Sequence, residues 1–241
     1  MNNLIIGACI YNEEKKFLKS FLDNISLLSK KIVIVDDGST DNSLSICSNY
    51  TSYIFQTNRL YAEDESKLRQ FWWEKAIAIA EDGDFICPMD ADTFYTNNSI
   101  IHYEEELYNC IKEGGDAIAG HQYDMWNEKE YREEPEFHWY ANLVPWVTCV
   151  RYKKNYNYYW YNMKIHGGSI PMNSYFSAYP CKVQAKHLAY STPELRKEKV
   201  IFYDKYDPND ILNNGRIRYL HIMDENPRLL PFIDLYEESS L

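Results

Sequence analysis

Residues 4–43, "LIIGACIYNEEKKFLKSFLDNISLLSKKIVIVDDGSTDNS", decide the fold of this chain. The apolar runs 4–10 and 31–35 indicate two buried strands, because each is nearly continuous and bounded by polar residues. Residues 12–30 between them predict an amphipathic helix, since one stripe at helical spacing is apolar. That stripe consists of Phe17, Phe21, Ile25 and Leu28. The stretch is therefore a strand–helix–strand unit.

The predicted helix is expected to begin at Asn12, a typical N-cap residue, with Glu13 and Glu14 in its first turn. The same alternation continues to about residue 123. It predicts strands at 53–55, 84–88 and 116–123, and helices just after 36–43 and at 65–81 and 97–115. Short units of this kind with near-continuous apolar strands predict an α/β fold, with a mostly parallel central sheet flanked by helices.

The last third of the chain is less regular and rich in aromatic residues. Residues 151–163, "RYKKNYNYYWYNM", form an aromatic band that either packs on the protein or stacks on sugar rings of an acceptor. A strand is predicted at 182–190 and a helix at 191–207, with Ser191 and Glu194 at capping-box spacing. Trp139, Tyr140 and Trp146 precede the band. We see no linker or repeat, and expect one domain over residues 1–241.

The composition of the chain limits the classes of partner that it is expected to bind. A formal net charge of −11 argues against nucleic acid or an anionic membrane surface as a partner. No apolar run is long enough for a signal peptide or a membrane span, so a lipid-linked acceptor would require peripheral docking. The six cysteines are scattered without metal-binding spacing, which predicts reduced thiols and a cytoplasmic location.

Three polar clusters, at 11–13, 36–39 and 90–92, each follow a predicted strand. Ligands of parallel sheets bind beyond the carboxyl ends of the strands, so these clusters are expected at one edge. Asp90 and Asp92 would repel an anionic ligand, with about 4 kcal/mol between unit charges 4 Å apart at an effective dielectric of 20. A divalent cation reverses that sign, and Mg²⁺ or Mn²⁺ binds carboxylates together with phosphate oxygens. The alternative is an Asx-turn that ends the strand.

The motifs "YNEE", "VDDGSTD" and "DAD", in this order, resemble the family 2 glycosyltransferases, whose fold is the Rossmann-like A-type glycosyltransferase fold. The similarity extends over roughly residues 3–120. It implies a nucleotide-sugar donor, usually linked to UDP, and a Mn²⁺ or Mg²⁺ ion. It also implies that residues 1–123 form the nucleotide-sugar-binding half, and 124–241 the acceptor-binding half with a C-terminal helix.

By position, the resemblance assigns the nucleotide-sugar site to Ile10, Tyr11, Glu13, Asp36, Lys67, Arg69, Asp90 and Ala91. Asp36 would contact the uracil, and either Lys67 or Arg69 the nucleotide. Asp92 would be a metal ligand, and Asp90 would contact the ribose or the metal. His187 would complete the metal shell. His166 is the less favoured alternative to His187.

The resemblance implies an inverting single displacement, in which a carboxylate takes the proton of the acceptor. The acidic pair that many family members carry for this purpose has no clear match here. Asp124 and Glu134 are the candidate bases, and the acceptor is a saccharide, a lipid-linked molecule or a protein.

Two other functions compete. The run "DADTF" also fits a haloacid dehalogenase-like phosphatase with Asp90 as nucleophile, but that class has the motif on its first strand. A non-catalytic carbohydrate-binding protein on the same fold is the second alternative. The glycine-rich motifs of dinucleotide-binding and P-loop enzymes are absent from the sequence.

Overall fold

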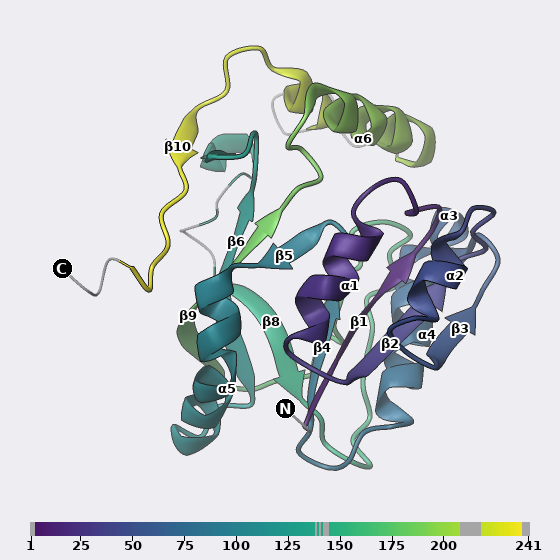
Figure 1. Ribbon diagram of the computed structural model, residues 1–241, viewed down its shortest axis with the longest axis vertical. Coiled ribbons are helices and arrows are strands. Elements are labelled where there is room, and N and C mark those ends of the chain that lie inside the picture. Colours follow the sequence, from purple (N-terminus) through teal and green to yellow (C-terminus); the bar gives the residue numbers. More distant parts are fainter. Residues whose placement is uncertain (1–2, 138, 140, 142–144, 208–217, 238–241) are drawn as a thin grey trace.

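The computed structural model describes residues 3–137, 139, 141, 145–207 and 218–237. In this part of the chain, an eight-stranded sheet has the strand order β3-β2-β1-β4-β8-β6-β9-β5, and β7 pairs with β10 in a small second sheet (Figure 1). The strands are β1 (Leu4–Ile10), β2 (Lys31–Asp36), β3 (Tyr53–Gln56), β4 (Phe85–Met89), β5 (Thr93–Tyr95), β6 (Ala117–Asp124), β7 (Glu130–Arg132), β8 (Trp146–Arg151), β9 (Ala178–His187) and β10 (Leu229–Pro231).

The sheet is mostly parallel, as predicted. Strands β3, β2, β1 and β4 all run in the same direction, and β6 pairs parallel with β9. Strand β8 is antiparallel to both β4 and β6, and β5 is antiparallel to β9. Because β1 lies between β2 and β4, the loops that follow these three strands leave the sheet at one edge.

Helices cover both faces of the sheet. Along β1, Leu4, Ile6 and Ala8 pack into the core cluster that contains the buried residues of α1 and α5, whereas Ile5 packs with α4 on the other face. This alternation follows from the two-residue period of a strand. The helices are α1 (Leu18–Ser26), α2 (Ser43–Cys47), α3 (Leu60–Glu63), α4 (Glu65–Ile77), α5 (Asn97–Lys112) and α6 (Pro193–Tyr206).

The first helix begins later than predicted. Helix α1 starts at Leu18, and Asn12 has a left-handed φ of 51° and does not cap it. The side chain of Asn12 instead accepts a hydrogen bond from the Thr40 backbone (2.8 Å), and the Glu13 N–H donates to Ser43 Oγ (2.9 Å). These contacts to the loop after β2 use the groups that would otherwise form the first helical turn.

The C-terminal third also corrects the prediction. The cap of α6 is Thr192, whose side chain accepts from the Leu195 N–H, and not Ser191. Strand β9 begins at Ala178, before the predicted strand, and the three-residue strand β5 was not predicted. Within the aromatic band, Tyr152, Tyr158 and Trp160 pack against the α4 core cluster.

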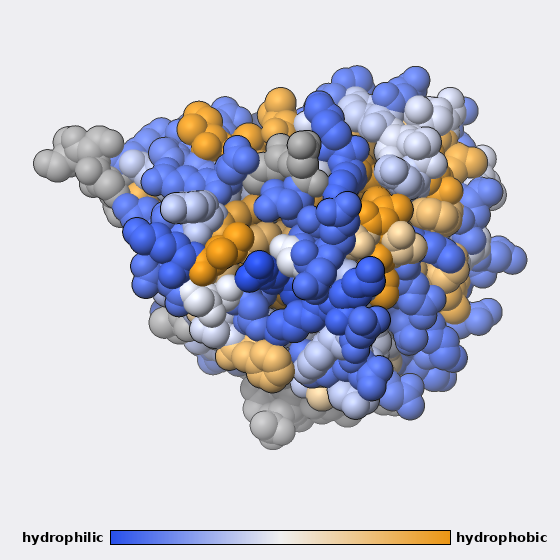
Figure 2. Space-filling view, turned by 90° about the horizontal axis from the view of Figure 1, so that it is seen from below, coloured by the Kyte–Doolittle hydropathy of each residue, from blue (hydrophilic) through white to orange (hydrophobic). Residues whose placement is uncertain are grey.

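Helix α6 lies across one end of the sheet, at the top of Figure 1. Seen from below, the surface is mostly hydrophilic with scattered hydrophobic patches (Figure 2). None of the six cysteines, all of which lie within the described residues, forms a disulfide, and four of them are buried. No helix within the described residues combines the length and the apolar character needed to cross a membrane.

Candidate active site

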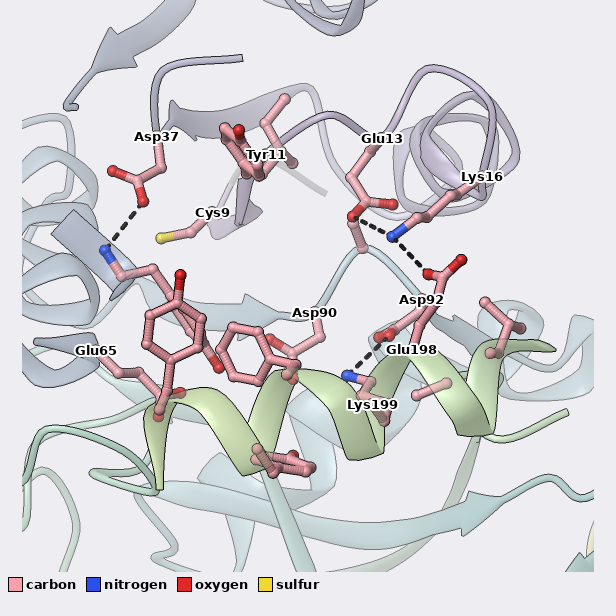
Figure 3. A pocket seen from close by; sticks show the side chains of 18 of the residues that line it. Cys9, Tyr11, Glu13, Lys16, Asp37, Glu65, Asp90, Asp92, Glu198 and Lys199 are labelled. Carbon is pink, nitrogen blue, oxygen red and sulfur yellow. Dashed lines mark hydrogen bonds and ion pairs between the residues drawn. The ribbon is translucent and has the colours of Figure 1, made fainter. Parts of the chain in front are cut away.

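A cavity of about 640 Å³ lies at the carboxyl ends of β1 and β4, where the polar clusters were expected to meet (Figure 3). One wall is formed by the loops after β1 and β2 with α3, and we call it the loop wall. The opposite wall is α6, which we call the helix wall. Asp90, Ala91 and Asp92 lie in the loop after β4 and also line the cavity.

The loop wall is held by reciprocal hydrogen bonds between the chain after β1 and the chain after β2. The Asn12 N–H donates to Ser39 Oγ (2.9 Å), and the Glu14 N–H donates to Asp41 Oδ2 (3.1 Å). In return, the Asn42 N–H donates to the Glu14 carboxylate (3.1 Å). Each loop therefore accepts hydrogen bonds from backbone N–H groups of the other.

Asp37, and not Asp36, lines the cavity. The carboxylate of Asp37 accepts hydrogen bonds from Thr57 Oγ1 (2.7 Å) and from the N–H groups of Leu60 (2.7 Å) and Tyr61 (3.0 Å). It thereby fixes the start of α3 against the end of β2. Asp36 is fully buried behind this loop, where its carboxylate lies 3.4 Å from Gln56 Nε2.

Arg69 is the basic residue that α4 brings to the cavity. Its Nη2 lies 2.6 Å from Asp90 Oδ1 and 3.3 Å from Glu65 Oε1, and its side chain is only 10% exposed. Burial disfavours its charge, but Asp90 and Glu65 raise the pKa of Arg69 well above its usual value. Lys67 lies outside the cavity, with a 69% exposed side chain that pairs with Asp64.

Asp92 is surrounded by cationic groups. His187 Nε2 lies 3.3 Å from Asp92 Oδ1, and Lys199 Nζ lies 3.8 Å from Asp92 Oδ2. On its other side, His187 Nδ1 donates to Asp124 Oδ1 (2.6 Å). The imidazole is therefore oriented by Asp124, which does not line the cavity itself.

These charges shift one another's pKa values. Burial disfavours the His187 imidazolium, but Asp92 and the hydrogen bond to Asp124 outweigh it and raise the pKa of His187 to about 10. Burial likewise opposes ionisation of Asp92, yet His187 and Lys199 hold the pKa of that carboxyl below its usual value. Both residues are therefore charged at neutral pH.

Lys16 joins the two walls through Glu13 and Glu198. Lys16 Nζ lies 3.8 Å from Glu13 Oε1 and 3.5 Å from Glu198 Oε2 on α6, as the dashed lines in Figure 3 show. Burial raises the pKa of Glu13 to about 7, even though Lys16 acts in the opposite direction.

Other lining residues were not predicted from the sequence. The Arg59 guanidinium lies 3.6 Å from the centre of the Tyr11 ring, an arrangement of the cation–π type. Arg59 has a left-handed φ of 59°. From the helix wall, Phe202 contacts Tyr61 with 5.6 Å between ring centres. No sequence motif marks these residues, because they come from a turn and a helix with ordinary composition.

Eight of the predicted site residues line the cavity: Ile10, Tyr11, Glu13, Arg69, Asp90, Ala91, Asp92 and His187. The structure does not place Asp36, Lys67, Asp124 or Glu134 there. Glu134 is taken up elsewhere, since it pairs with the buried Arg132 and accepts from the Arg228 N–H (2.9 Å). His166 also lines the cavity, and its Nε2 lies 2.5 Å from the Tyr219 hydroxyl.

The aromatic band was predicted either to pack on the protein or to stack on sugar rings of an acceptor, and none of residues 151–163 lines the cavity. The aromatic surface of the cavity comes instead from Tyr11, Tyr61 and the helix wall. Of the residues before the band, Trp139 packs edge-to-face on Trp126. Tyr140 lies outside the described residues.

The cavity offers part of a metal shell. Asp92 lines the cavity, and its buried Oδ1 is ion-paired with His187 Nε2 at 3.3 Å but makes no well-formed hydrogen bond. Within the described residues, no group of three or more His, Cys, Asp or Glu side chains is arranged to hold a metal ion. Mg²⁺ often takes only one or two carboxylates and completes its shell with phosphate and water, so Asp90 and Asp92 fit an ion that binds together with a diphosphate.

Comparisons with known proteins agree with this geometry. Residues 6–179 match the sequence model of glycosyl transferase family 2. Glycosyltransferase GlyG of Streptococcus pneumoniae is 34% identical over 136 residues, which cover 52% of this chain and 40% of GlyG.

Among solved structures, TarS of S. aureus superposes with a TM-score of 0.53 at 16% identity, over 86% of this chain and 40% of TarS. TarS 1–349 in complex with UDP gives 0.52 at 17% identity, over 93% and 70% of the two chains. The A-type glycosyltransferase fold is thus confirmed, while the chain spans only 40% of the length of GlyG and of TarS. Because the family model extends over well more than half of its residues, this chain belongs to glycosyl transferase family 2.

Proposed function

We propose that this protein transfers a sugar from a nucleotide-diphosphate donor, with UDP as the nucleotide, to a hydroxyl group of an acceptor. The observation that carries the proposal is the position of Asp90 and Asp92 on a cavity that is also lined by residues following β1 and β2. Membership of glycosyl transferase family 2 supports it, and so does the UDP complex of TarS, a protein of the same fold. Family membership also favours this function over that of a phosphatase.

We further propose that Mn²⁺ or Mg²⁺ is the cofactor. Asp92, with Asp90 and His187 beside it, would hold the ion. The bound ion would neutralise the charge that develops on the leaving diphosphate. His187 must lose its proton to act as a ligand. In the ion-paired arrangement described above it holds Asp92 in place.

The proposed reaction is a single displacement with inversion. The acceptor oxygen forms a bond to the anomeric carbon, while the bond from that carbon to the β-phosphate oxygen breaks and its electron pair stays on the phosphate. The hydroxyl proton passes to a carboxylate base, a step that typically contributes 10²–10⁴-fold. Of the two candidate bases, Asp124 contacts His187, which lines the cavity, and the Asp124 side chain is 27% exposed. Glu134 is held by Arg132.

The remaining proposals concern the rest of the chain. We propose one domain over residues 1–241, because β6, β8, β9 and β5 complete the sheet that β1–β4 begin. We also propose a cytoplasmic location, which is supported by six cysteines that form no disulfide within the described residues. The acceptor is a saccharide, a lipid-linked molecule or a protein.

A thermal-shift screen of nucleotide sugars, with and without Mn²⁺, tests the donor and the cofactor together. We expect one UDP-sugar to raise the melting temperature, and to do so more strongly with Mn²⁺ than with EDTA. Stabilisation by none of the nucleotide sugars would overturn the proposal. Slow release of UDP from the stabilising donor, without acceptor, would separate an enzyme from a non-catalytic carbohydrate-binding protein.

A further inference from the structure

The helix wall lies outside the part of the chain that the family model matches. The match to the family model ends at residue 179, whereas α6 spans Pro193–Tyr206. Yet α6 lines the same cavity as the family motifs, and one of its side chains, Lys199, reaches Asp92. The contribution of α6 to ligand binding therefore has to be inferred from this structure.

A diphosphate in this cavity needs local positive charge, because the chain as a whole carries a formal charge of −11. Two cationic side chains near the Asp90–Asp92 loop already face two carboxylates each. Arg69 is shared by Glu65 and Asp90, and His187 lies between Asp92 and Asp124. Their charge is largely balanced within the protein.

Lys199 differs from these groups. Its Nζ lies 3.8 Å from Asp92 Oδ2, beyond hydrogen-bond distance, and within the described residues Asp92 is the carboxylate with which it forms an ion pair. The side chain is 33% exposed, so the ammonium group borders the open cavity. A loosely paired ammonium group can turn toward a second anion without breaking a hydrogen bond. Figure 3 shows Lys199 reaching from α6 toward the loop that carries Asp90 and Asp92.

We infer that Lys199 binds the diphosphate of the donor and neutralises charge on the leaving group, so that α6 is part of the donor site. This inference rests on the proposed function and extends it to a residue beyond the family motifs. It also moves α6 from the acceptor half, to which the sequence assigned it, to the donor half.

The test is calorimetric titration of the full chain with UDP and with uridine, in EDTA and again in Mn²⁺. Lys199→Met removes the charge and keeps the length of the side chain, whereas Lys199→Arg retains the charge. Lys197→Met is the matched control, because Lys197 is exposed on the same helix and does not line the cavity. Melting temperatures show whether each variant is folded.

We expect Lys199→Met to weaken UDP binding on the order of tenfold in EDTA, the effect of losing one charge-assisted contact. Uridine binding should stay unchanged, Lys199→Arg should retain most of the UDP affinity, and Lys197→Met should match the wild type. Equal UDP binding by wild type and Lys199→Met would overturn the inference and leave the proposed function standing, as would a parallel loss of uridine binding. If the wild type binds no UDP even with Mn²⁺, both proposals fail.

Discussion

The two walls of the cavity are held in different ways. In the loop wall, the backbones after β1 and β2 bond to each other's side chains, and Asp37 holds the start of α3 by three hydrogen bonds. The helix wall is attached to the opposite side by long ion pairs, Lys199 to Asp92 and Lys16 to Glu198, and by the ring contact of Phe202.

This difference predicts that the two walls respond differently to substitution. Hydrogen bonds to buried charged groups are sensitive to geometry and to the loss of a single partner, so they keep the loop wall in one arrangement. Exposed ion pairs contribute about 0–1 kcal/mol each and weaken with salt. We therefore expect substitutions in the loop wall to cost stability, and those in the exposed ion pair of Lys16 with Glu198 to cost little.

The largest effect is expected at Asp92, in the loop after β4 that lies between the two walls. Asp92→Asn keeps the shape of the side chain but removes the charge, and we expect sugar transfer to fall by about 10³-fold or more because cation binding and its electrostatic effect are lost. Product formation from the UDP-sugar found by the thermal-shift screen would be measured, with the exposed Asp204→Asn as control. Activity that survives both this substitution and EDTA would contradict the assigned role.

Asp37→Ala addresses the loop wall directly. It removes the acceptor of three hydrogen bonds from the end of β3 and the start of α3, so we expect the free energy of unfolding to fall by about 3 kcal/mol. Urea denaturation would measure this change. Asp204→Ala, on the exposed side of α6, should change the same quantity by less than about 0.5 kcal/mol. Similar effects at the two positions would remove the contrast between the walls.

A pH series tests the burial of Glu13 in the cavity. The pKa of Glu13 is raised in the folded chain from 4.5 to about 7, so its contribution to stability is fully present below pH 4.5 and is lost as the pH rises through 7. Glu13→Gln should therefore be more stable than the wild type by about 1–2 kcal/mol at pH 8, with the difference shrinking toward pH 5. Glu104→Gln, exposed on α5, is the control. A difference that grows toward acid pH would contradict this assignment.

The smallest effect is expected for the ion pair between Lys16 and Glu198, whose side chains are 42% and 61% exposed. A double-mutant cycle with Lys16→Met and Glu198→Gln should give a coupling free energy below about 0.5 kcal/mol at physiological salt. Chemical denaturation of the four proteins would measure it. A coupling above about 2 kcal/mol would show that the helix wall is held more firmly than its contacts indicate.

Much of the loop wall could be predicted from the sequence. Apolar runs identified β1, β2 and β4, and the rule that ligands bind at carboxyl strand ends brought Tyr11, Asp90 and Asp92 together. The structure places Asp37 on the cavity and Asp36 behind it, because the motif alone does not show which of two adjacent carboxylates faces the cavity. The alternation of side chains along a strand decides that question, and here it favoured Asp37.

The helix wall could not be placed from the sequence. The helix itself was predicted, with an N-cap one residue away from the observed Thr192. Its position depends on tertiary contacts such as that of Lys199, which no local pattern encodes. The same holds for Asp124 and Glu134, whose hydrogen-bond partners His187 and Arg132 decide whether their carboxylates reach the cavity.

The short strand β5 has a consequence for how the site keeps its dimensions. It follows Asp92 directly and pairs with the end of β9, so that Thr93 lies opposite His187, while the Leu188 N–H donates to the Asp92 carbonyl (2.8 Å). A slip of one residue in this ladder would turn His187 to the other face of the sheet. The spacing between Asp92 and His187, nearly a hundred positions apart in the sequence, is thus set by the backbone register of this ladder.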